Sequence, residues 1–145
     1  MQISSGLRNH LMAVGSFKDA LDGAYLKIYS GTPPATADAA IPAGATLLCT
    51  VTVDAGPTGL TFEASTTTGL LLKAGAESWE GVNVADGTAA WFRMAPPADA
   101  GDLSTTAIRV QGSAAQAGAD LNLTNPELLT GATQTVDYFS VLMPA

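Results

Sequence analysis

The spacing of hydrophobic residues along the chain changes once, after the first 23 residues. Leu7, Leu11 and Val14 recur at intervals of four and three, so they form one apolar stripe on a predicted helix. A serine before this stripe is a candidate N-cap, and Gly15 follows it at the position where helices end. A further serine begins a second capping pattern after Gly15. Residues 1–23 are therefore predicted to form a helical N-terminal arm of two short helices.

After the arm the hydrophobic period is two, which is the spacing of β-strands. Leu26 and Ile28 share one face of the first predicted strand, and a second strand is expected over Thr46–Val53. A tight hairpin is expected at 85–87, where a glycine can adopt positive φ. Further strands recur about every 8–12 residues and predict an all-β domain over 24–145, a jelly-roll-like β-sandwich. These strands are expected at 60–64, 70–73, 78–84, 89–94, 107–111, 120–123 and 133–142.

Charge is scarce in this chain. Charged residues make up 13% of its 145 residues, whereas ~25% is usual for a soluble domain, and the mean hydropathy is positive at +0.24. A free monomer keeps more charge on its surface, because charge opposes association. The composition therefore predicts that much of the surface lies against other protein, as in a subunit of an assembly.

The charge balance and the hydrophobic runs exclude several classes of partner. A net charge of −7 and scattered basic residues argue against nucleic acid, since phosphate binding needs clustered Lys and Arg. No apolar run approaches the ~18 residues of a membrane helix, and the short apolar stretch near the N-terminus lacks the length of a signal peptide. We therefore expect no nucleic-acid partner, no membrane partner, and synthesis in a cytoplasm.

Catalytic and metal-binding chemistry is poorly represented. His10 is the single histidine, and Cys49 is the single cysteine and lies within an apolar predicted strand. One His and one Cys do not provide the ligand spacing of a zinc site. The closest carboxylate pairs lie at strand starts or in loops, where acidic residues serve turns: Glu77 with Glu80, and Asp99 with Asp102. The sequence predicts no enzyme activity, no metal site and no cofactor.

The N-terminal arm is the first candidate for contact with other subunits. Its apolar residues Leu7, Leu11, Val14 and Phe17 would form a docking arm or a dimer contact. The same residues would also serve a helical cover over one open end of the sandwich, and the sequence does not separate these two interpretations.

A loop and two tryptophans supply the remaining candidates. Residues 32–45 form a long Ala- and Pro-rich loop after Tyr29, with Pro33 and Pro34 at its start, and such a loop is unusual unless a partner orders it. Trp79 and Trp91 are either core residues, intersubunit contacts or a platform for sugars, because aromatic rings serve all three purposes.

Several segments resemble small structural proteins of tailed bacteriophages. The resemblance rests on LKIYSGTPP at the start of 26–40, DGTAAWFRM at 86–94, LRN at 7–9, GADLNL at 118–123 and GATQTVDYF at 131–139. Among these phage proteins, the size and predicted fold of this chain are similar to those of capsid cement proteins, also called decoration proteins.

The resemblance implies a jelly-roll cement subunit on the outer capsid surface of the virion. Its expected partners are the major capsid protein and further copies of itself, as a homodimer or homotrimer. One alternative within the phage is a tail-tube, tail-tip or head–tail joining subunit. Another, from a different class, is a carbohydrate- or receptor-binding β-sandwich, and this one depends on Trp79 and Trp91.

Overall fold

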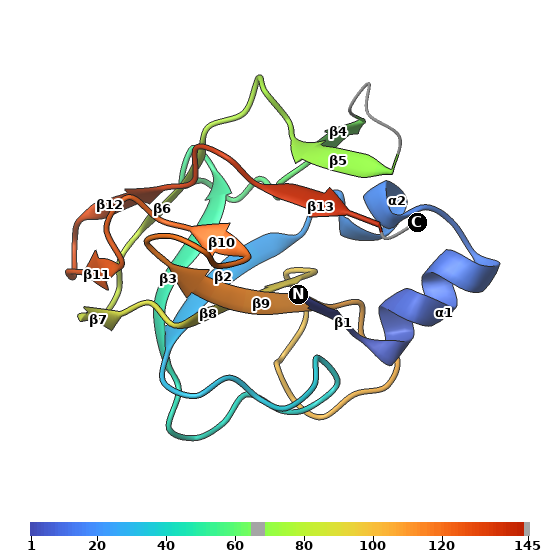
Figure 1. Cartoon of the computed structure of the whole chain (residues 1–145), viewed down its shortest axis with the longest axis horizontal. Helices are drawn as coiled ribbons and strands as arrows, with labels where there is room; N and C mark the ends of the chain where they lie inside the picture. The colour runs from blue at the N-terminus through green and yellow to red at the C-terminus, as the bar shows by residue number, and fades with distance from the viewer. Residues whose placement is uncertain (65–68, 144–145) are drawn as a thin grey trace.

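The computed structural model describes residues 1–64 and 69–143, a mostly β chain with two short helices near its start (Figure 1). The helices are α1 (Ser5–Ala13) and α2 (Phe17–Leu21). The strands are β1 (Gln2–Ile3), β2 (Tyr25–Ser30), β3 (Thr46–Val53), β4 (Phe62–Ala64), β5 (Leu70–Lys73), β6 (Trp79–Val82), β7 (Gly87–Thr88), β8 (Trp91–Ala95), β9 (Val110–Ala115), β10 (Leu121–Asn122), β11 (Glu127–Leu128), β12 (Thr133–Thr135) and β13 (Ser140–Leu142).

Most strands belong to one large sheet in the order β1-β9-β8-β2-β3-β6-β12. β10 joins it by pairing in parallel with β9, whereas the other pairs of this sheet are antiparallel. The alternation of β2 places Leu26 between Met94 of β8 and Val51 of β3. Two residues on, Ile28 lies beside Phe92. All five side chains are fully buried, so this face of the sheet forms the core.

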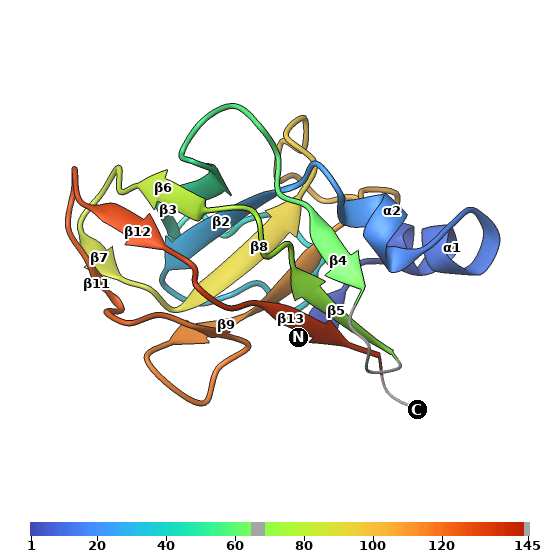
Figure 2. The same cartoon turned by 90° about the horizontal axis from the view of Figure 1, so that it is seen from above.

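A second sheet, of order β13-β5-β4, lies over that apolar face (Figures 1 and 2). Aromatic side chains fill the space between the two layers. The ring of Phe62 meets Trp79 edge-on at 5.5 Å, and Phe139 lies 5.6 Å from Phe92 of the large sheet. Burial of such rings away from water is the main source of stability. The expected all-β, sandwich-like fold with a helical N-terminal segment is confirmed.

The N-terminal arm packs into the same core as the strands. β1 pairs with β9, so the start of the chain is hydrogen-bonded to the large sheet. Ser4 caps α1 by accepting a hydrogen bond from the backbone N–H of Leu7, and Ser16 caps α2 in the same way. Leu7 and Leu21 are fully buried in the core. The two expected helices form, and they close one end of the sandwich.

Two features of the strand pattern differ from the sequence-based expectation. No hairpin forms at 85–87, because β6 pairs with β3 and β12 while β7 pairs with β11. Gly87 does not adopt positive φ. The single strand expected over 133–142 is two strands in different sheets, β12 and β13. In both places, pairing with strands distant along the chain replaces the arrangement that the local sequence favours.

Candidate assembly surfaces

The arm divides its four candidate contact residues between core and surface. Leu7 is fully buried and Phe17 is 6% exposed, so both side chains contact the protein's own core. Leu11 is partly buried against the same core. Val14 is 76% exposed and is the one side chain of the four that lies mainly at the surface. Of these four residues, Val14 is therefore the main one that the arm exposes to a partner.

Tyr29 and Trp91 also lie inside the chain. Their rings stack at 4.4 Å between centroids on the outer face of the large sheet, where β2 pairs with β8. Trp91 is fully buried and Tyr29 is 4% exposed, and burial raises the pKa of the Tyr29 hydroxyl. Trp79, at 1% exposure, belongs to the main core. Neither tryptophan forms an exposed platform for a sugar or a direct contact for another subunit.

The loop at 32–45 is ordered by the chain itself. Arg109 of the segment before β9 is 1% exposed and forms a paired ion contact with Asp99, through Nε at 2.9 Å and Nη2 at 2.6 Å. Its Nη1 donates to the backbone carbonyls of Ala37 and Asp38. The guanidinium thereby fastens the loop to the outer face of the large sheet, and the expected need for a partner to order it does not arise.

Arg93 provides a second attachment for the same loop. Its Nη2 donates to the carbonyl of Ala39 at 3.0 Å and to the side chain of Gln111 at 2.9 Å. Gln111 in turn donates to the carbonyl of Pro34, which is buried. Burial and, second, the neighbouring charge of Arg109 lower the pKa of Arg93. This polar layer beneath the loop is the counterpart of the apolar layer on the other face of the sheet.

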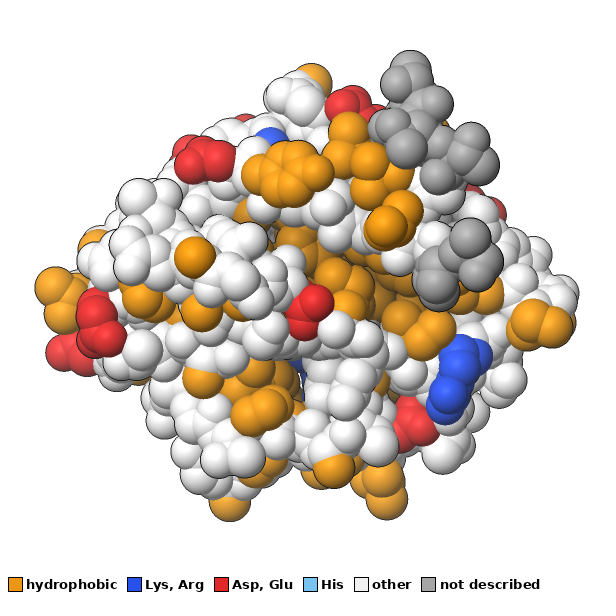
Figure 3. Space-filling view, in the orientation of Figure 1, with side chains coloured by type: hydrophobic (Ala, Val, Ile, Leu, Met, Phe, Trp, Pro, Cys, Tyr) orange, Lys and Arg blue, Asp and Glu red, His pale blue; other side chains and the backbone are white. Residues whose placement is uncertain are grey.

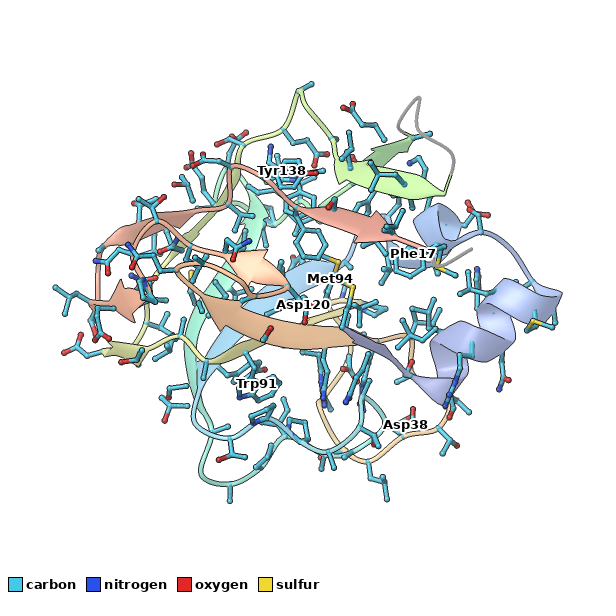
Figure 4. All side chains as sticks on the ribbon, in the orientation of Figure 1. Phe17, Asp38, Trp91, Met94, Asp120 and Tyr138 are labelled. Atoms are coloured by element: carbon cyan, nitrogen blue, oxygen red, sulfur yellow. The ribbon has the colours of Figure 1, made fainter. Side chains whose placement is uncertain are left out.

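Beside the start of this loop lies a crevice of about 180 Å³. Pro33, which is exposed, Ser113 and Asp120 form part of its walls. Asp120 is labelled in Figure 4. The Asp120 carboxylate accepts hydrogen bonds from the Met1 amino group and from Ser113. Burial alone would raise the pKa of Asp120, but these hydrogen bonds outweigh it and hold that pKa below its ordinary value. The polar groups of the crevice therefore satisfy one another.

Exposed apolar side chains gather at the β7–β11 end of the molecule. In β6 and the residues after it, Trp79 and Asn83 point inward, and the alternation of the strand therefore turns Val82 and Val84 outward. These valines are 50% and 61% exposed. The Asn83 side chain donates to the backbone carbonyl of Leu129, whose side chain is 64% exposed at the same end of the molecule.

The charge around these side chains is uniformly acidic. Asp86 accepts hydrogen bonds from the backbone and side chain of Thr130, and these hydrogen bonds lower its pKa. Glu127 accepts one from Thr88 across the β7–β11 pair. The sequence has no Lys or Arg after Arg109, and neither carboxylate forms an ion pair with any residue that the structure describes. We call Val82, Val84 and Leu129, with Asp86 and Glu127, the valine surface.

The exposed side of α1 has a different character. Met12 is 87% exposed, and Arg8, Asn9 and Ala13 are exposed on the same helix; Val14, at 76% exposure, follows the helix as its C-cap. Arg8 lies beside Asp38: it donates to the hydroxyl of Ser5, and that hydroxyl donates to the Asp38 carboxylate. The hydrogen bonds from Ser5 and then the Arg8 charge lower the pKa of Asp38. We call Arg8, Asn9, Met12, Ala13 and Val14 the α1 surface.

A groove of about 340 Å³ runs beside the α1 surface, between α1 and residues 106–108. Ala13, Val14 and Ile108 line it, together with polar groups that include His10. The groove is therefore open to solvent and largely apolar along one wall.

The two surfaces lie at opposite ends of the longest axis of the molecule. Both views place α1 at one end, and place β7 and β11 at the other (Figures 1 and 2). The space-filling view shows acidic side chains at the β7–β11 end and, near α1, a basic side chain with an acidic side chain beside it (Figure 3). Sequence reasoning missed the valine surface, because alternation alone does not say which side of a strand faces inward.

The single thiol of the chain lies in the core. Cys49 is fully buried, and burial raises the pKa of its thiol to about 11. Within the described ranges, no group of three or more His, Cys, Asp or Glu side chains is placed to hold a metal ion. The two described helices fall short of the length and apolar character that crossing a membrane requires.

Comparison of the chain with protein-family models, with curated proteins and with solved structures found no match.

Proposed function

We propose that the protein is a structural subunit of a tailed-bacteriophage virion, and specifically a cement protein on the outer surface of the head. The observation that carries the assembly role is the pair of exposed, apolar surfaces at opposite ends of a charge-poor molecule. The phage resemblance of the sequence supplies the setting. The acidic balance supports an outward position, because a lining that faces the genome would repel it.

The proposed mechanism is additive contact. Each copy bridges neighbouring subunits of the major capsid protein and need bury only about 800 Å² per partner. Many such contacts act together through multivalency, so a weak single contact stabilises the whole shell against internal pressure. The buried arginines beneath the loop at 32–45 support this role, since a subunit that transmits force needs loops that are fastened to its sheet.

A second candidate is a tail-tube, tail-tip or head–tail joining subunit. The placement of the two surfaces favours it, because unlike contacts between opposite ends of a subunit generate rings when the rotation between copies closes. Copy number separates the candidates: a cement protein is present in numbers comparable to the major capsid protein, whereas a tail ring contains far fewer copies.

The test uses purified virions that carry or lack the chain. We expect the chain in particles at a copy number comparable to the major capsid protein. Particles that lack it should release their DNA at a lower temperature and after milder osmotic shock, as followed with a DNA-binding dye. Absence of the chain from particles, or equal robustness of heads without it, would overturn the cement proposal. A low copy number with intact heads would favour the tail.

A further inference from the structure

We propose that the protein binds a small monovalent anion, of the size of chloride, beneath the loop at 32–45 and against the side chains of Arg93 and Trp91. The site goes beyond the proposed function, because it concerns the interior of one subunit and not its contacts with others. The two residues lie two positions apart on β8, so both side chains project from the same face of the large sheet. Figure 4 shows Trp91 on the side of the loop and Met94 on the opposite, core side.

The first observation is the set of buried N–H donors at this place. Arg93 Nε, Arg93 Nη1 and Trp91 Nε1 are buried, and each lacks a hydrogen-bond partner in the part of the chain that the structure describes. The Arg93 Cζ atom lies 5.8 Å from the centre of the Trp91 ring, so the three donors belong to one small region. Guanidinium and indole N–H groups donate and do not accept. A buried donor without an acceptor is costly, and more so when it is charged, so this region needs an acceptor.

The second observation is an excess of positive charge. Arg93 and Arg109 place two buried guanidinium groups beneath the loop. Within the described ranges, Asp99 is the one carboxylate that pairs with either of them, and Arg109 engages both of its oxygens. Lys27 of β2 lies opposite Arg93 in the sheet and forms no ion pair with any described residue. Tyr29 stays neutral near pH 7, since burial raises its pKa. A negative charge is therefore missing here, in a chain whose net charge is −7.

The surroundings favour an ion with a single charge. Two buried guanidinium groups and one carboxylate leave one buried positive charge, which one monovalent anion neutralises. A doubly charged phosphate would instead leave a negative charge buried without a partner, and such burial is unfavourable. The other donor of the Arg93 head group, Nη2, is held by the Ala39 carbonyl and the Gln111 side chain, so the guanidinium is fixed before the ion binds.

The crevice beside the start of the loop provides a route from solvent. Gln111 and Pro34 line this space of about 180 Å³, and Gln111 also accepts the hydrogen bond from Arg93. An ion in the crevice therefore reaches the side chain that contacts the guanidinium. The Asp120 carboxylate on the crevice wall is paired with the Met1 amino group, which offsets its repulsion of an anion.

Thermal unfolding of the purified full-length protein tests the site. Chloride is raised from about 1 mM to about 300 mM, with sodium gluconate keeping the ionic strength constant. An anion that binds only the folded state raises the midpoint, and we expect a rise of about 3–5 °C. Bromide should act as chloride does. Gluconate alone should not, because it is too large to enter. Water would satisfy the buried donors without this dependence on the anion.

Matched variants locate the effect. Arg93→Gln removes the positive charge and two of the three donors, and should abolish the chloride-dependent rise. Lys18→Gln removes the same charge from a partly exposed position and should keep it. Trp91→Phe removes one donor and keeps a ring, and should weaken chloride binding about threefold to tenfold. This last variant decides the placement if Arg93→Gln does not fold.

Chlorine NMR provides a second measurement that needs no variant. The chloride line should broaden in the presence of the folded protein, and the broadening should saturate and be displaced by bromide. Equal unfolding midpoints in chloride and gluconate, together with no saturable broadening, would overturn the inference. A chloride effect that survives intact in Arg93→Gln, or in Trp91→Phe where the former does not fold, would overturn the placement beneath the loop.

Discussion

Cys49 shows how burial alone removes the reactivity of a side chain. It lies on β3 beside Ile28 of β2, is fully buried, and forms an isolated bridge with Asn83. A thiolate is the reactive form of cysteine, and burial disfavours it because a charge loses its hydration. This buried position agrees with the apolar strand that the sequence predicts around Cys49.

We predict that native Cys49 does not react with Ellman's reagent at pH 8, since its pKa is raised to about 11 and the reagent has no access. The thiol should react fully once the protein is unfolded in urea. The matched control is Val84→Cys, at a position 61% exposed, which should react within seconds in the folded protein. Rapid reaction of native wild-type protein would contradict the buried placement of β3.

Gly6 is a second residue whose identity is set by packing. It lies within α1, and a Cβ there would meet the backbone carbonyl oxygen of Thr106 at 2.3 Å. Backbone cannot move aside as a flexible side chain can, so α1 would have to shift away from residues 106–107. Gly44 provides a contrast, because nothing lies within 4 Å of a Cβ at that position.

We predict that Gly6→Ala lowers the free energy of unfolding by about 1–3 kcal/mol, as overpacking does. The loss should appear even though alanine favours a helix by ~1 kcal/mol. Gly44→Ala should lie within about 0.5 kcal/mol of wild type. Urea denaturation measures the free energy of unfolding of both variants. Equal values for Gly6→Ala and Gly44→Ala would mean that α1 does not pack closely against residue 106.

At the scale of elements, the sequence predicted where the strands lie better than it predicted which strands pair with one another. The period-two pattern predicted β2, β3 and β5 with nearly the observed bounds, because each has a continuous apolar face. It failed at 85–87 and 133–142, where the outcome depends on strands far along the chain. Local propensity does not contain that information.

The loop at 32–45 illustrates the same limit for the candidate site. Its composition has no periodicity, so the sequence suggested an outside partner. The stabilising groups are Arg93 and Arg109, which come from β8 and the segment before β9. A basic residue in a strand is ordinarily assigned to solvent, and only the folded pairing shows that these two lie beneath a loop.

We predict that Asp99→Asn destabilises the protein by about 3 kcal/mol, because it leaves the buried Arg109 guanidinium without its carboxylate. Hydrogen exchange of residues 37–39 should accelerate in the same variant, since the loop loses its attachment. The control is Lys18→Gln, which removes the partly exposed ion pair of Lys18 with Asp22 and should change stability by less than about 1 kcal/mol. An Asp99→Asn variant as stable as this control would contradict the fastening role.

At the scale of the whole molecule, carboxylates hold several distant segments in place. Hydrogen bonds from the Ser5 hydroxyl and backbone lower the pKa of Asp38, and those from the Thr130 backbone and hydroxyl lower the pKa of Asp86. Asp38 lies beneath the start of α1 (Figure 4), and Asp86 ties the β6–β7 connection to the turn after β11. Each carboxylate stabilises the fold only in its ionised form.

We predict that stability falls as the pH drops below about 4. A carboxylate whose pKa is lower in the folded state binds more protons when unfolded, so acid favours unfolding. The contribution is complete above the ordinary Asp pKa of about 3.9 and is lost as the pH passes through the folded values. The urea midpoint at pH 3 should lie below that at pH 6. Asp38→Asn should reduce the difference between the two urea midpoints. An unchanged difference in that variant would mean that other groups cause the acid sensitivity.

The last two basic residues of the chain, Arg93 and Arg109, are both buried, and this has a practical consequence for protease mapping. Trypsin cleaves after Lys and Arg, so a folded copy offers it no accessible cleavage point beyond Lys73. Residues 74–145 would then survive as one fragment, whereas an unfolded copy would yield 74–93, 94–109 and 110–145. Mass spectrometry of the tryptic fragments would therefore show whether the copies inside a particle are folded, because cleavage after Arg93 and Arg109 requires these side chains to leave the core.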